Sequence, residues 1–163
     1  MYIELHAASA FSFLDGASLP EALIVRAASL GYPAVAILDR DGVYGAPRFH
    51  LAAKKAGLKA IIGAEITIGS RRTSDARRPT ADGRRSSDPS LRTSDLGHRT
   101  SDSIFRLPVL IESRTGYKNL CRLLTTMKLR AEKGEGALTL DEIDGHTGGL
   151  IALGGRTMLS GAR

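Results

Sequence analysis

Apolar and polar positions along the chain follow two alternating patterns, one typical of strands and the other typical of helices. Short apolar runs predict strands at residues 2–6 (YIELH), 33–38 (PAVAIL), 60–68 (AIIGAEITI), 105–113 (FRLPVLIES) and 148–155 (GGLIALGG). Stretches with apolar residues at helical spacing predict helices at 18–32, 45–59 and 115–131, with a short acidic helix at 139–146. This alternation indicates an α/β fold with βαβ units and a largely parallel sheet.

Local signals indicate where the first two helices begin and end. Ser18 is a candidate N-cap of the first helix, with Pro20 in the first turn and Gly31 as the stop. Gly57 is expected to end the second helix. The two helices therefore fill the intervals between the first three predicted strands.

The third helix carries a single apolar stripe, because its large apolar residues recur every three or four positions: Leu120, Leu123, Leu124 and Met127. Such a stripe predicts a core element. Cys121 lies beside it, and we expect a small buried or half-buried residue there rather than a nucleophile.

Residues 71–105 interrupt the α/β pattern with a low-complexity repeat. The unit R-x-T/S-D recurs with aspartates at positions 75, 82, 88, 95 and 102, and Leu91 and Leu96 are the only large apolar residues from 71 to 102. Such a segment buries too little apolar surface to offset its ordering entropy, so we expect a disordered insertion. The alternative is a nucleic-acid-binding arm, since arginines on a flexible chain contact phosphates, although the interleaved aspartates weaken the field.

Composition narrows the class of protein. A chain of 163 residues with 42% hydrophobic residues is sufficient for one domain. Half of the net charge of +6 comes from residues 71–102, where eight arginines face five aspartates. Cys121 is the sole cysteine, and no apolar run approaches the roughly 18 residues of a membrane span, so we expect a cytoplasmic protein without membrane contact.

Ionisable residues collect where the first three predicted strands end. His6 follows the first strand, Asp39, Arg40 and Asp41 follow the second, and Glu65 lies in or after the third. Taken singly, His6 can be explained as a buried histidine, and Asp39 or Asp41 as a cap of the following helix. Because functional sites of parallel α/β sheets lie at the carboxyl ends of the strands, their shared placement favours a site, active or degenerate.

The order of these residues resembles the opening motifs of the PHP (polymerase and histidinol phosphatase) domain family. The matching stretches are ELHAASAFSFLDGAS, SLGYPAVAILDRDGVYGAPRF and GLKAIIGAE. Within that family, SAFSFLDGAS, LIESRTGYKNLCRLLT and KGEGALTLDEI resemble the N-terminal region of the bacterial DNA polymerase III alpha chain, closest to its error-prone form. The resemblance implies that residues 1–70 begin a PHP-like domain, that 71–105 are an insertion, and that 106–163 are a truncated continuation.

The resemblance also implies a fold and a metal chemistry. The family fold is a distorted βα barrel, so we expect a partial barrel here. Active family members hold divalent metals such as Zn²⁺ or Mn²⁺ at the strand ends. Carried over by position, the remnant ligands of this chain are His6, Asp15 and Glu65.

Two ligand positions are lost. The second histidine of the first family motif is Ala8 here, and the central histidine of the D-H-D motif is Arg40. A guanidinium stays charged and has no lone pair for a metal. We therefore expect no bound metal, no other cofactor and no catalytic residues, and we predict that Arg40 instead contacts Asp15, Glu65 or a neighbouring aspartate. His50 and His98 match no family motif.

Three functions follow as expectations. The first is a non-catalytic PHP module of an error-prone DNA polymerase (replication and translesion repair), partnered with the rest of the polymerase or its accessory proteins and reaching DNA through them. Since the chain contains no palm, fingers or thumb, nucleotidyl transfer by the chain alone is not expected. The second is a residual metal-dependent phosphoesterase or 3'-5' exonuclease using His6, Asp15 and Glu65. The third is a nucleic-acid-binding module that acts through the repeat.

Overall fold

A computed structural model describes residues 2–69, 104–131 and 136–154. The two expectations for the repeat, disorder and nucleic-acid binding, concern residues that lie almost entirely outside these ranges. Among the described residues, no helix is long and apolar enough to cross a membrane.

The described strands form one five-stranded sheet in the order β1 (Glu4–Ala7), β2 (Ala34–Arg40), β3 (Lys59–Ile68), β4 (Phe105–Ile111) and β5 (Leu150–Ala152). β1, β2 and β3 pair in parallel, as their connecting helices predict. β4 runs antiparallel to β3, and β5 runs antiparallel to β4. The expectation of a largely parallel sheet is therefore wrong for its second half.

The register of β3 and β4 shows where the chain leaves the sheet and where it returns. Ile68, the last residue of β3, pairs with Phe105, the first residue of β4. The chain thus leaves and re-enters the sheet at the same end, and two strands joined in this way must run in opposite directions. The repeat occupies the interval between them, and the sequence shows no helical pattern there of the kind that a parallel crossover would need.

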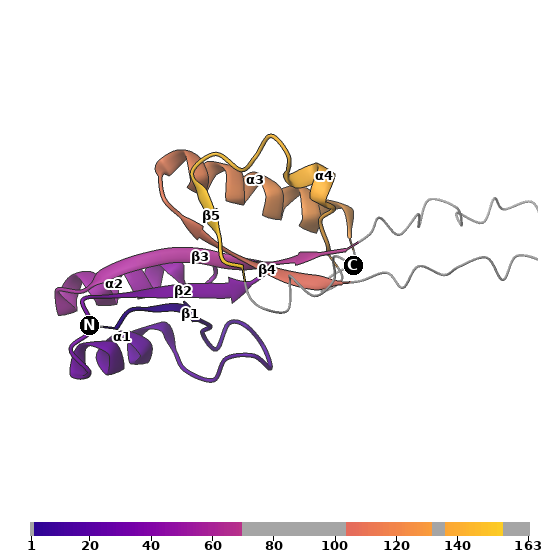
Figure 1. Cartoon of the computed structure of the whole chain (residues 1–163). Helices are drawn as coiled ribbons and strands as arrows, with labels where there is room; N and C mark the ends of the chain where they lie inside the picture. Colours follow the sequence, from indigo (N-terminus) through magenta and orange to yellow (C-terminus); the bar gives the residue numbers. More distant parts are fainter. Residues whose placement is uncertain (1, 70–103, 132–135, 155–163) are drawn as a thin grey trace, which may run out of the picture.

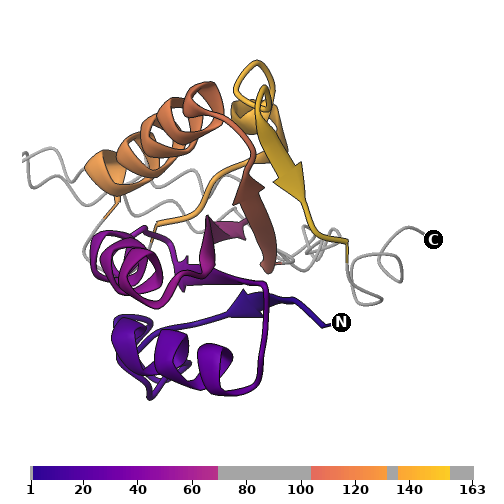
Figure 2. The same cartoon turned by 90° about the vertical axis from the view of Figure 1, so that its left-hand side faces the viewer.

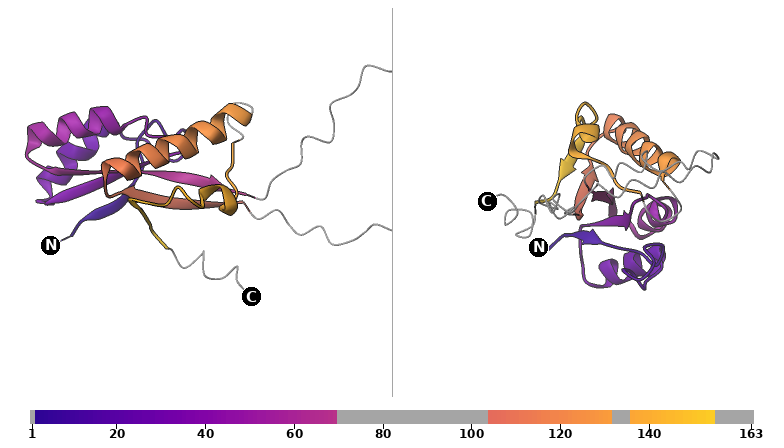
Figure 3. Two further views of the ribbon diagram at one scale, coloured as in Figure 1. Left: turned by 90° about the horizontal axis from the view of Figure 1, so that it is seen from above. Right: turned by 90° about the vertical axis from the view of Figure 1, so that its right-hand side faces the viewer.

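In the described part of the chain, four helices connect or follow the strands: α1 (Pro20–Ser29), α2 (Ala46–Ala56), α3 (Arg114–Arg130) and α4 (Leu140–Ile143). α1, α2 and α3 lie on the same face of the curved sheet (Figures 1, 2 and 3). Two apolar cores fill this interface. One joins α1 and α2 to β2 through residues such as Ile24, Ile37 and Phe49, and the other joins α3 to β3 and β4.

None of α1, α2 and α3 lies on the other face of the sheet. Because side chains alternate along a strand, the neighbours of Ile37 on β2 point to this face, and Ala36 and Leu38 form a smaller apolar cluster there with Leu110 of β4. We call this surface the inner face of the sheet. The polar groups described below lie on it, beyond the cluster.

The helix predictions are confirmed except for one cap. Gly57 ends α2 with a φ of 70°. The apolar stripe of α3 is buried, and Cys121 beside it is half-buried. The N-cap of α1 is Leu19 rather than Ser18, and no side chain caps this helix. Ser18 instead accepts a backbone hydrogen bond from Ala10, which holds the loop after β1.

Candidate functional site

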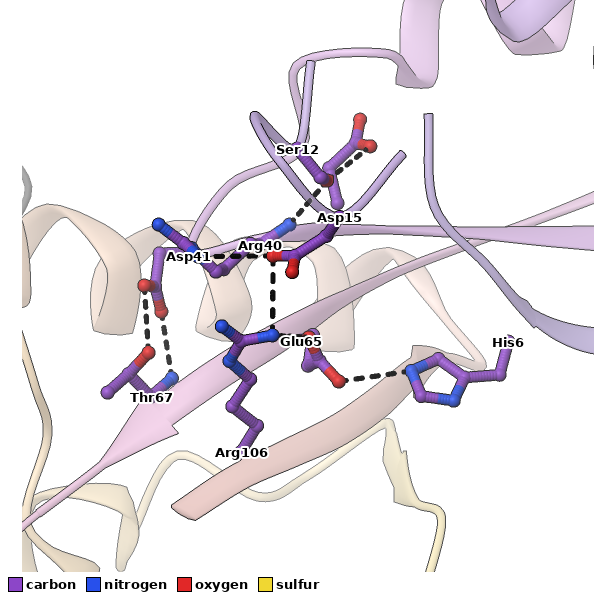
Figure 4. Close-up of polar contacts among 9 residues, drawn as sticks. His6, Ser12, Asp15, Arg40, Asp41, Glu65, Thr67 and Arg106 are labelled. Carbon is purple, nitrogen blue, oxygen red and sulfur yellow. Dashed lines mark hydrogen bonds and ion pairs between the residues drawn. The ribbon is translucent and has the colours of Figure 1, made fainter. Parts of the chain in front are cut away.

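Side chains from four strands and one loop meet near the carboxyl ends of β1, β2 and β3 on the inner face (Figure 4). Glu65 projects from β3 onto the inner face, because its neighbours Ala64 and Ile66 belong to the core beneath α3 and side chains alternate along a strand. On β4 the same alternation places Arg106 on the inner face, since Leu107 and Val109 pack toward α3. His6 comes from β1 and Arg40 from the last position of β2.

These groups form a continuous chain of polar contacts. The His6 Nε2 atom lies 3.2 Å from Glu65 Oε1, and the other oxygen of Glu65 accepts a 3.4 Å hydrogen bond from Arg106 Nη1. The same Arg106 nitrogen donates to Asp15 Oδ2 at 3.3 Å. Arg40 Nη1 donates to that oxygen of Asp15 at 3.1 Å. We call these five residues the rim network.

The predicted contact of Arg40 is confirmed, because its guanidinium pairs with Asp15. The rim network also brings together His6, Asp15 and Glu65, the three positions identified as remnant ligands. Arg106 was not identified from the sequence, and yet it contacts both carboxylates. Glu65 is the least exposed member, with 17% of its side chain accessible, whereas Arg106 is 41% accessible.

Asp39 does not join the rim network, although it lies beside Arg40 at the end of β2. Its carboxylate is 1% exposed and points to the helical side. Oδ1 accepts hydrogen bonds from the Ser9 amide, the Ser9 hydroxyl and the Ser12 hydroxyl, and Oδ2 accepts one from the amide of Gly45, the N-cap of α2. Asp39 is thus a fully bonded internal carboxylate that fixes the loop after β1 against α2.

Asp41, which directly follows β2, binds the end of β3. Its two oxygens accept the amide and the hydroxyl of Thr67, each at 2.8 Å, and its own amide donates to the Glu65 carbonyl. Asp41 has a φ of 50°, in the left-handed region that aspartate tolerates better than most residues. It therefore ends β2 and fastens it to β3 rather than facing the rim network.

The loop after β1 holds Asp15 in place. The Ser12 hydroxyl accepts the amide of Arg40, and the Asp15 amide donates to the Ser12 carbonyl. Gly16 packs so closely that a Cβ there would lie 2.2 Å from the Ser9 carbonyl oxygen. The conformation of residues 9–16 is therefore set by these backbone contacts, and Asp15 reaches the two arginines without a rearrangement.

The residues present do not fit a divalent metal cluster. Within the described ranges, no group of three or more His, Cys, Asp and Glu side chains is arranged to hold a metal ion. Ala8 offers no ligand, and Arg40 is committed to Asp15. The Arg106 guanidinium lies between the two carboxylates that a cation would need to share. His50 lies on α2, on the helical side of the sheet, and is not part of the rim network. His98 is not among the described residues.

Comparisons with known proteins agree on one family. A family model for the PHP domain matches residues 4–160. The error-prone DNA polymerase of Ralstonia nicotianae is 38% identical over 154 residues, covering 94% of this chain and 12% of the polymerase. That of Rhodopirellula baltica is 34% identical over 153 residues, covering 93% of this chain and 10% of the polymerase. This chain therefore spans about a tenth of the length of these relatives.

One solved structure gives a further likeness, at low sequence identity. An amidohydrolase from Chromobacterium violaceum, determined with bound sulfate and no metal, superposes with a TM-score of 0.48 at 22% identity. The match covers 77% of this chain and 32% of that one.

Proposed function

The chain belongs to the PHP domain family, and we propose that it is a catalytically silent member that serves as a structural module of an error-prone-polymerase type of protein. The observation that supports the loss of catalysis is the position of Arg106 Nη1, within 3.4 Å of both Glu65 and Asp15. A site that activates water with divalent cations needs those carboxylates free to ligate. Here both are neutralised by arginine.

The structural part of the proposal is supported by the relatives. Both polymerases named above are roughly ten times longer than the matched segment. A module of this size that lacks its own chemistry can act by packing against the remainder of such a polymerase or its accessory proteins. DNA would then be contacted by the parent polymerase rather than by the rim network, whose two arginines are already paired.

The loss of catalysis can be tested directly. The purified chain is incubated with bis-p-nitrophenyl phosphate and with 3'-labelled single-stranded DNA, in the presence of Mn²⁺ or Zn²⁺. We expect no release of nitrophenol or nucleotide above a protein-free control. Turnover that disappears in the Glu65→Gln variant would contradict the proposal, because the glutamine side chain keeps the shape of the site and removes its least exposed carboxylate.

A second candidate is a residual metal-dependent phosphoesterase or 3'-5' exonuclease. The specific observation in its favour is that His6 Nε2 and Glu65 Oε1 are already 3.2 Å apart, with Asp15 joined to them through one guanidinium. Displacement of Arg106 by a cation would expose three ligands. The same assay separates the two candidates, since the second requires metal-dependent turnover that Glu65→Gln abolishes.

The polymerase assignment needs a separate test. The DNA downstream of codon 163 is sequenced and translated in all three forward frames. A polymerase core, in frame or displaced by a frameshift, would support the proposed module, whereas an unrelated gene would contradict it.

A further inference from the structure

We infer that Arg106 is the built-in cation of this site: its guanidinium, assisted by Arg40, takes over the charge neutralisation that bound metal provides in active PHP domains. The inference deepens the proposed function and rests on its claim that the site has lost metal chemistry. It adds a prediction about Arg106, a residue on which the family resemblance is silent. Its consequence is a site whose stability is independent of divalent metal.

Charge balance is the first argument. Asp15 and Glu65 are brought together at one edge of the sheet, and two carboxylates in a shared cleft repel each other unless positive charge lies between them. Arg106 and Arg40 supply two positive charges for these two negative ones. The sum is neutral when His6 is neutral, so no further cation is needed.

Geometry assigns the central position to Arg106 rather than to Arg40. Arg40 Nη1 contacts Asp15 alone among the described carboxylates, at 3.1 Å. Arg106 Nη1 reaches Asp15 and Glu65 together. Both contacts come from one terminal nitrogen, which carries two hydrogens and can donate one to each carboxylate.

The backbone also positions Arg106. Its register partner on β3 is Thr67, and Thr67 is the residue that Asp41 fastens through two 2.8 Å hydrogen bonds. The end of β2, the end of β3 and the start of β4 are therefore held together at the point where Arg106 projects. An arginine presented in this way loses less side-chain freedom on pairing than one at a frayed strand end.

Removal of the Arg106 charge is the test. In Arg106→Met the apolar stem is largely kept, but Asp15 keeps only Arg40 and Glu65 keeps only His6. Thermal unfolding of the full chain is measured in EDTA and again with added Mn²⁺. We expect the unaltered chain to unfold at the same temperature in both, and Arg106→Met to unfold about 2–4 °C lower in EDTA with part of that loss recovered by Mn²⁺.

Arg48→Met is the matched control. Arg48 makes a two-bond ion pair with Glu21 on the helical side, at 2.6 Å and 3.0 Å, and is about as exposed as Arg106. The substitution removes an arginine ion pair of similar accessibility, together with the contact of the Arg48 guanidinium with the Phe11 ring at 5.7 Å, but removes no member of the rim network. Because the two bonds of Arg48 are shorter than the contacts of Arg106, the loss of stability can be as large, and the distinguishing expectation is that Mn²⁺ leaves the unfolding temperature of Arg48→Met unchanged.

Three results would overturn the inference: no Mn²⁺ response in Arg106→Met, an equal Mn²⁺ response in Arg48→Met, or stoichiometric Mn²⁺ binding that stabilises the unaltered chain. Should Arg106→Met fail to fold, Arg106→Lys retains the charge, and it is expected to unfold at or slightly below the temperature of the unaltered chain, with no response to Mn²⁺. If the expectations for Arg106 fail, the result of the phosphoesterase assay still stands, because that assay measures turnover and not thermal stability. An inactive chain with an unimportant Arg106 would refute this inference alone.

Discussion

The hydroxyl of Ser9 donates a 2.7 Å hydrogen bond to the carboxylate of Asp39, a residue 30 positions further along the chain. Both side chains are buried, at 0% and 1% exposure. The contact joins the loop after β1 to the end of β2, and that loop carries Asp15 into the rim network. Asp39 thus helps to position the loop that carries Asp15, although its own carboxylate points to the helical side of the sheet.

Asp39→Ala should destabilise the chain by about 3 kcal/mol, because it leaves the Ser9 and Ser12 hydroxyls and the Gly45 amide buried without their acceptor. Urea unfolding measures the change. Asp144→Ala is the control: Asp144 is exposed and accepts one bond, from the amide of Gly145, so we expect a change within about 0.5 kcal/mol. Similar losses in the two variants would contradict the role of Asp39.

Gly116→Ala should be strongly destabilising, by about 3 kcal/mol or more, because a Cβ at this position would lie 1.8 Å from the Gly149 carbonyl oxygen. The first turn of α3 packs directly on the backbone that leads into β5, and the clash would separate them. Gly148→Ala provides the comparison, since its Cβ would meet nothing closer than 3.8 Å. Urea unfolding of both variants is the measurement, and a tolerated Gly116→Ala would show that this close packing is dispensable.

Arg130→Met should weaken the chain in a pH-dependent way. Arg130 pairs with both oxygens of Glu142, joining the end of α3 to α4, and this contact lowers the pKa of Glu142 from 4.5 to about 2. A carboxyl whose pKa falls on folding stabilises the fold above its unfolded pKa and loses that contribution as the pH falls through its folded pKa. The difference between the unaltered chain and Arg130→Met should therefore be largest above about pH 4.5 and shrink toward pH 2.

The matched control for this pH series is Lys128→Met. Lys128 lies in the same last turn of α3 and, within the described part of the chain, makes no ion pair. Urea midpoints are measured for the three proteins across the acid range. A stability difference for Arg130→Met that does not vary with pH, or one that Lys128→Met reproduces, would rule out the ion pair as its source.

Placing histidines at the two proposed ligand positions should by itself give only weak metal binding. Ala8→His with Arg40→His returns two imidazoles, but Arg106 still lies between Asp15 and Glu65. We expect weak Zn²⁺ or Mn²⁺ binding by this double variant and at least tenfold tighter binding once Arg106→Met is added, measured by calorimetry. Equal affinity of the double and triple variants would show that Arg106 does not block the site.

Much of the fold follows from local sequence. Apolar runs and helical spacing give the strands and helices within a few residues, and Gly57 ends α2 because glycine adopts its φ of 70° without strain. The contact between Arg40 and Asp15 was also predictable, since an arginine in place of a ligand at a carboxylate-rich edge needs a partner. The N-cap of α1 was not, because Ser18 is held by a backbone contact with Ala10 that no local rule contains.

The sequence by itself determined the strands, the helices and the family motifs, because each depends on residue type and short-range spacing, and the proposed loss of ligands at Ala8 and Arg40 rests on the same motifs. Only the tertiary structure decided the role of Arg106. In a parallel sheet the start of β4 would lie at the end opposite to Glu65; the antiparallel pairing of β4 with β3 brings Arg106 to the same end. That direction depends on where the chain returns after residue 68, which is a long-range property, and it places the decisive cation 41 residues from Glu65 and 91 from Asp15.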